Sequence, residues 1–247
     1  MKHTGKYLYS VIYLIALLGF VGCSSKLSVT AKADKSTDVS FQTAMGPVLS
    51  STIRSITTGM GSNYVNSKNG QGLFSAETIQ EAFRDSDFTN VKVATPTQNS
   101  LSIAASLPHA DKQTHATGTL RAADFITCSE NVMVLTISPA NLKTMTEGLP
   151  QSTKGYLDLF MAPVFNGEKM TKSEYRALIA TVYGENIAKE LESSNIDVEL
   201  LPPKGKSIKK ALVPKSGSKA TAAKAMFSIP LLDFLTLSST ETYSIEW

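Results

Sequence analysis

The sequence contains little cysteine, little histidine and little charge. Only two cysteines, Cys23 and Cys128, occur among 247 residues, so a framework of several disulfides is excluded. Cys128 follows Ile126 and Thr127, and we expect it to pack as a small apolar side chain. Charged residues make up only 18% of the chain, and the formal net charge is +3. Because this charge gives no broad basic surface, nucleic acid is not an expected partner.

Groups for catalysis and metal binding are also scarce. Of three histidines, His109 and His115 lie near Asp111, in a spacing that matches no standard metal site. No G-x-S-x-G segment is present to hold a nucleophilic serine, and the glycine-rich segments are not followed by a P-loop lysine. We therefore predict no metal, no cofactor and no enzymatic activity. A hydrolase with an unrecognised site stays as an alternative.

The N-terminal segment has the layout of an export signal. Lys2 and Lys6 precede an apolar run from residue 8 to residue 21, which is 14 residues long. A transmembrane helix needs about 20 residues, so the run is predicted to be the apolar part of a signal peptide. Gly22 then places a small residue directly before Cys23.

The segment Phe20-Val21-Gly22-Cys23 resembles the lipobox of bacterial lipoproteins. Phe20 stands where the usual pattern has Leu, which is similar to the relaxed lipoboxes of spirochaetes. The resemblance covers residues 1 to about 25. It implies that residues 1–22 are a signal peptide and that Cys23 carries lipid, palmitate included. It also implies an exported protein held on a membrane of the cell envelope, on the periplasmic or surface side. A cysteine with two or three acyl chains is held firmly.

The chain after this cysteine is expected to have two parts. Residues 23–38 are polar and show no sustained period, which predicts a lipidated tether. Residues 39–247 are predicted to form a single α+β domain that folds without the tether. Strand patterns and helix patterns are segregated along the chain, which favours a largely antiparallel sheet with a central helical segment packed on it.

Apolar residues at helical spacing predict several helices. Their expected ranges are 47–59, 76–84, from 139 onward, 156–165 and 172–191. Thr171 and Glu174 form a capping box at the start of the last helix. One face of that helix is expected to be lined by Tyr175, Leu178, Ile179 and Val182, with an interruption at Gly184.

Alternation of apolar and polar residues predicts strands that have one covered face. The expected strands lie at 91–93, 101–107, 132–137, 196–200, 225–229 and 243–247. The last of these carries Trp247, the only tryptophan of the chain. A terminal strand with this residue is expected to be paired into a sheet, because unpaired chain ends fray.

A lysine-rich stretch near the C-terminus departs from the low overall charge. It contains seven lysines, with no acidic residue between Leu200 and Leu232. Its first four, Lys204, Lys206, Lys209 and Lys210, are predicted contacts for anionic lipid head groups. The plainer interpretation is a solvated loop. Similarly, the apolar helix at 156–165 suits a lipid pocket or ordinary core packing.

These observations favour a non-enzymatic lipoprotein of the cell envelope, acting as a structural or binding module anchored through Cys23. The first alternative is a lipid-binding or membrane-interacting lipoprotein that uses the apolar helices and the lysine-rich loop. The second is the hydrolase. The expected partners are the membrane, reached through the lipid anchor, and either anionic lipid or another envelope protein.

Overall fold

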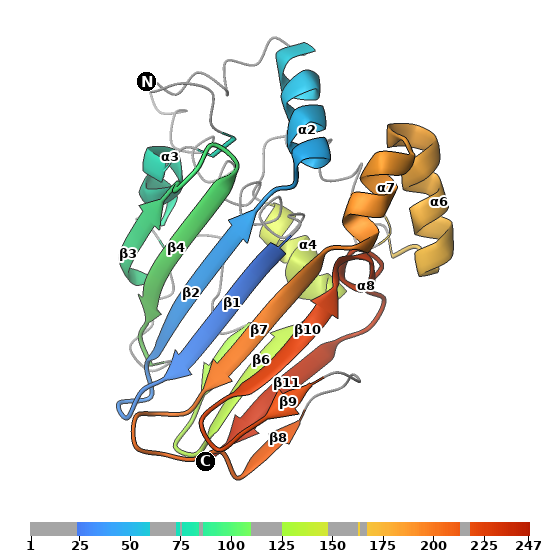
Figure 1. The fold of residues 1–247 in the computed structure, drawn as a ribbon. Coiled ribbons are helices and arrows are strands. Elements are labelled where there is room, and N and C mark those ends of the chain that lie inside the picture. The colour runs from blue at the N-terminus through green and yellow to red at the C-terminus, as the bar shows by residue number, and fades with distance from the viewer. Residues whose placement is uncertain are drawn as a thin grey trace.

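Two sheets packed face to face form the framework of the protein (Figure 1). The computed structural model describes residues 24–59, 73–74, 76–83, 86–109, 125–147, 163, 167–212 and 218–247. The larger sheet has the strand order β3-β4-β2-β1-β7-β10-β9, and the smaller has the order β5-β6-β11-β8. The strands are β1 (Ser24–Ala31), β2 (Thr37–Ala44), β3 (Thr89–Ala94), β4 (Ser100–Leu107), β5 (Ile126–Cys128), β6 (Val132–Ile137), β7 (Asn195–Leu201), β8 (Lys210–Leu212), β9 (Lys219–Ala220), β10 (Ala225–Pro230) and β11 (Glu241–Glu246).

The predicted α+β class is confirmed. The strand pairs are antiparallel except for β1 and β7, which run parallel. The helices are α2 (Pro47–Gly59), α3 (Ala76–Ala82), α4 (Pro139–Glu147), α6 (Lys172–Tyr183), α7 (Glu185–Glu192) and α8 (Leu231–Leu235). Side chains from α6, α7 and α8 enter the same apolar core as those of both sheets, so the central helical segment packs as expected.

The predicted tether is wrong, because its residues form the middle of the larger sheet. Strand β1 pairs with β2 on one side and with β7 on the other. Val29 and Ala31 are buried, and Leu27 packs against them from a partly buried position. The alternation of these three residues with polar neighbours was the overlooked signal. The boundary at residue 39 consequently falls inside β2. The predicted signal peptide and Cys23 lie outside the described residues.

Helices α6 and α7 form a hairpin around Gly184. The predicted capping box is present: the Thr171 hydroxyl accepts a hydrogen bond from the Glu174 amide, and the Glu174 side chain accepts one from the Thr171 amide. Gly184 has a φ of 96°, a backbone conformation that favours glycine. Tyr175 and Ile179 are buried as predicted.

The expected buried face of α6 is only half correct. Leu178 and Val182 are 41% and 56% exposed. The reason is that α7, α8 and the core cover the side of α6 that carries Tyr175 and Ile179. Leu178 and Val182 lie along the flank of the same helical stripe, away from Ile179, and face solvent.

The C-terminal strand joins the two sheets through its side chains. Tyr243, Ile245 and Trp247 are buried, as their alternation predicted. The Tyr243 ring stacks on Phe227 of β10 with a centroid distance of 4.1 Å, and the Trp247 amide donates to the Asn131 carbonyl at 3.0 Å. This strand is therefore paired with β6 and packed on the larger sheet at the same time.

Candidate functional site

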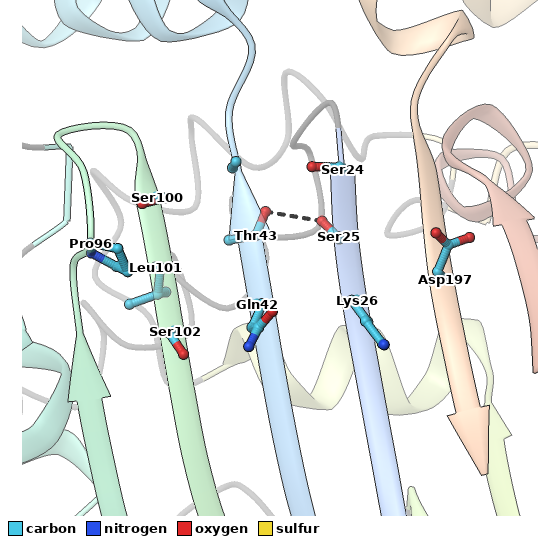
Figure 2. Close-up of a pocket in the computed structure, with 11 residues that line it drawn as sticks. Ser24, Ser25, Lys26, Gln42, Thr43, Pro96, Ser100, Leu101, Ser102 and Asp197 are labelled. Carbon is cyan, nitrogen blue, oxygen red and sulfur yellow. Dashed lines mark hydrogen bonds between the residues drawn. The ribbon is translucent and has the colours of Figure 1, made fainter. Parts of the chain in front are cut away.

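A hydroxyl-rich hollow lies at the end of the larger sheet where β1 begins (Figure 2). Its volume is about 400 Å³. It is lined by Ser24, Ser25, Lys26, Gln42, Thr43, Ala44, Pro96, Ser100, Leu101, Ser102 and Asp197. Ser25 and Thr43 point toward one another across β1 and β2, with their hydroxyl oxygens 3.0 Å apart.

Strand register places four polar residues of this hollow in one row, whereas Ser25 and Thr43 are buried on the opposite face of the sheet. Lys26 pairs with Gln42 on one side and with Asp197 on the other, and Gln42 pairs with Ser102. Since side chains two residues apart share a face, the row lies on the outer, solvent-facing side of the sheet. The Ser228 hydroxyl extends it by donating to Asp197 at 2.7 Å. The row offers hydroxyl and amide groups for hydrogen bonds to a polar ligand, and the eleven lining residues include no imidazole or thiol.

The next row of the same face is centred on Glu199, a residue that the sequence analysis did not single out. Its side chain is only 11% exposed and lies between two lysines. Lys224 donates to one carboxylate oxygen at 2.7 Å, and Lys26 lies 2.9 Å from the other. Ser28 donates a further bond at 3.2 Å. Hydrogen bonds from Lys224 and Lys26 hold the pKa of Glu199 at about 2, against an ordinary value of 4.5.

This depressed pKa predicts an acid-dependent loss of stability. Because the folded pKa lies below the unfolded one, the contribution of Glu199 is complete above about pH 4.5 and disappears as the pH falls toward 2. We expect Glu199→Gln to lower the free energy of unfolding at pH 7 by about 1–2 kcal/mol, a figure discounted for the exposure of both lysines. Urea denaturation at several pH values measures it.

The matched control is Glu246→Gln. Glu246 pairs with Lys210 at 3.2 Å, but its side chain is 44% exposed, so we expect a change within about 0.5 kcal/mol. The expectation is contradicted if the two substitutions lower the free energy of unfolding equally. It is also contradicted if Glu199→Gln loses as much stability between about pH 4.5 and pH 2 as the unaltered protein.

The lysine-rich stretch lies at the opposite end of the larger sheet. Ser24 pairs with Asn195 at the start of β7, and the stretch begins after β7 ends at Leu201. A strand of seven residues is about 23 Å long, so Lys204 and Lys206 are far from the hollow. Lys209 and Lys210 are also exposed, and Lys210 is paired with Glu246. The structure therefore brings these four lysines together near one another and away from Ser24.

A second hollow, of about 460 Å³, lies between α6, α8 and the end of β10. Its charged groups are engaged with one another. Lys172 forms an ion pair with Asp233, and Arg176 contacts Glu192 at 2.8 Å and Glu185 at 2.5 Å. The Lys172 pair joins α6 to α8, and the Arg176 pairs join α6 to α7, so the arrangement has a structural explanation.

Several residues considered in the sequence analysis give no site. Asp111, His115 and most of residues 156–165 lie outside the described residues, and His109 lies just after β4. Cys128 is half-buried in β5, where burial raises the pKa of its thiol. Within the described ranges, no group of three metal-ligating side chains is found. Nor does that part of the chain contain a helix long and apolar enough to cross a membrane.

Comparisons with known proteins define no family for this chain. No family model matches it, and no curated protein matches it. One similar solved structure is the folded domain of LppM from Mycobacterium tuberculosis, determined by NMR. The TM-score is 0.35 and the identity 8%, over 90% of this chain and 86% of that one. A likeness of this size carries no conclusion about function.

Proposed function

We propose that the protein is a non-enzymatic lipoprotein of the cell envelope, anchored through acylated Cys23, whose folded domain sits directly at the membrane surface. The observation that carries the proposal is the position of the cysteine. Cys23 follows the signal-like run and Gly22, and the next residue, Ser24, already belongs to β1. One peptide link, about 3.8 Å between Cα atoms, then separates the lipidated residue from a central strand.

This connection supports a module that works close to its membrane. The hydroxyl-rich hollow lies at the anchored end, so its polar row would face the head-group region. Hydroxyl, amide and ammonium groups of this kind hydrogen-bond polar and phosphate-bearing molecules. The eleven residues that line the hollow include no imidazole or thiol, and we therefore prefer binding to the hydrolase alternative.

The alternative of lipid binding through the lysine-rich loop fits this geometry less well. Lys204, Lys206, Lys209 and Lys210 are at the end of the sheet opposite Ser24. We propose that they face away from the anchoring bilayer, where an anionic surface of another envelope component would meet them. In this arrangement, the end of the larger sheet that carries Ser24 contacts the head groups of the anchoring membrane.

The anchor is tested by Cys23→Ala in the full chain. We expect this variant to lose all incorporation of a fatty-acid analogue and to leave the membrane fraction, because one thiol accepts the lipid. Cys128→Ala is the matched control and should be labelled like the unaltered protein. Labelling of Cys23→Ala at the control level would contradict the lipoprotein proposal.

A further inference from the structure

The α6–α7 hairpin projects from the same end of the protein as Ser24. Helix α7 ends at Glu192, and after two intervening residues the chain enters β7 at Asn195, the register partner of Ser24. The Ser194 carbonyl also accepts a hydrogen bond from the Leu231 amide, which ties the base of the hairpin to α8. Figure 1 shows the hairpin extending beyond the end of the sheet at which β1 starts. A helix of eight residues adds up to about 12 Å to that reach.

A second projection lies on the other side of β1. Helix α2 follows β2 and rises from the same sheet end (Figure 1). Its first amides are held by α7: Val48 and Leu49 donate to the Glu190 carboxylate at 3.0 and 2.8 Å. Strand β1 therefore begins, at Ser24, at the sheet end from which two helical projections extend, and hydrogen bonds join these projections to each other. A bilayer that holds a lipid next to Ser24 therefore lies on the side of the protein that carries both projections.

The end of the hairpin carries the apolar side chains that such an approach requires. Leu178 and Val182 are exposed and lie one helical turn apart, in the half of α6 that approaches Gly184. Tyr183 follows, but it packs against the core and its hydroxyl is buried.

The charges near this tip are compensated within the hairpin. Arg176 binds both Glu185 and Glu192, and Lys189 lies 4.0 Å from Glu185. The acidic residues therefore do not present an uncompensated negative surface to phospholipid head groups.

We propose that the tip of the α6–α7 hairpin, defined by Leu178 and Val182, docks into the interface of the bilayer that holds Cys23. The inference rests on the proposed lipid anchor. Two exposed apolar side chains bind a bilayer weakly by themselves. An anchored domain, however, meets its own membrane at a high effective concentration, so weak contacts suffice to fix its orientation.

The test places a tryptophan at the tip of the acylated full chain in phosphatidylcholine vesicles that contain brominated lipid. The fluorescence of the new tryptophan in Val182→Trp is measured as the emission in excess of that from Trp247. On vesicles it should shift to the blue, and brominated lipid should quench it by about half, because an interfacial side chain lies at the boundary between head groups and acyl chains. The matched control is Leu212→Trp at the far end of the molecule. Leu212 is 54% exposed, close to the 56% of Val182. The emission of the tryptophan that replaces it should be the same with and without brominated lipid.

The outcomes separate the docking from the anchor. A chain that floats with the vesicles while Val182→Trp stays unquenched overturns the docking and leaves the anchor standing. Equal quenching at positions 182 and 212 also overturns it, because the domain would then have no fixed orientation. A chain that fails to float contradicts the anchor and, with it, the docking. The same tryptophan variants made as residues 24–247, without the cysteine, should show no quenching.

Discussion

A chain consisting of residues 39–247 is expected not to fold, although its sequence pattern suggests a self-sufficient domain. The cut removes all of β1 and the first two residues of β2. It deletes the buried side chains of Val29 and Ala31 and the partly buried Leu27. It also leaves the paired edges of β2 and β7 without partners. Unpaired buried backbone groups are costly, and the loss is comparable to the about 5–15 kcal/mol that keeps a domain folded.

Circular dichroism during heating measures this result. Residues 24–247 should give a cooperative transition, whereas residues 39–247 should give none, together with exposed apolar surface that binds a hydrophobic dye. A synthetic peptide of residues 24–38 is the added control, because it supplies β1 in trans and should restore part of the transition. A cooperative melt of residues 39–247 within a few degrees of the longer chain would show that β1 is dispensable.

The second large effect is expected at Tyr243. Its ring is fully buried and stacks on Phe227, so it connects the smaller sheet to the larger one. Burial raises the pKa of Tyr243, and the protonated hydroxyl donates a hydrogen bond to Glu241. Tyr243→Ala removes the ring and leaves a cavity between the sheets, which costs about 3–5 kcal/mol for a buried aromatic residue. We expect a fall in thermal midpoint of more than about 10 °C, since 1 kcal/mol corresponds to a few degrees in a domain of this size.

The fluorescence of Trp247 reports the same transition. This side chain is buried at the end of β11, so its native emission should be blue-shifted and should move to the red on unfolding. Tyr243→Phe is the control: it keeps the stacked ring and loses only the bond to Glu241, and a change of about 1 kcal/mol is expected. Deletion of residues 243–247 should prevent folding altogether. Similar stabilities of the Ala and Phe variants would show that the stacking does not hold the sheets together.

Both expectations depend on strands whose patterns of alternation differ greatly in strength. The last strand is evident from Tyr243, Ile245 and Trp247, which alternate strictly with polar residues. Strand β1 has the same alternation in Leu27, Val29 and Ala31, but the two smaller residues and the serine-rich surroundings make the signal weak. Both strands are nevertheless central in their sheets. Strength of pattern therefore did not predict position in the sheet, because alternation reports a covered face and not the neighbouring strands.

The candidate site also has features that are evident in the sequence and features that only the tertiary structure shows. Sequence singled out Cys23 and the lysine-rich stretch, since an isolated cysteine and a run without acids are visible in one dimension. It did not single out the hydroxyl-rich hollow or Glu199. Ser25 and Thr43 meet only because β1 and β2 pair in one register. Glu199 is held by Lys26, which lies on the neighbouring strand β1, and by Lys224, which directly precedes β10 on the other side.

By itself, the sequence determined the features that depend on neighbouring residues: the capping box of α6, the starts of α2 and α4 at Pro47 and Pro139, and the inward faces of β4 and β11. Only the tertiary structure decided the central place of β1, the exposure of Leu178 and Val182, and the separation of the lysine-rich end from Ser24. The physical reason is that backbone propensity and periodicity act over a few residues. Strand pairing, ion pairing and the choice of which helix face is covered are free energies shared between segments far apart in the chain.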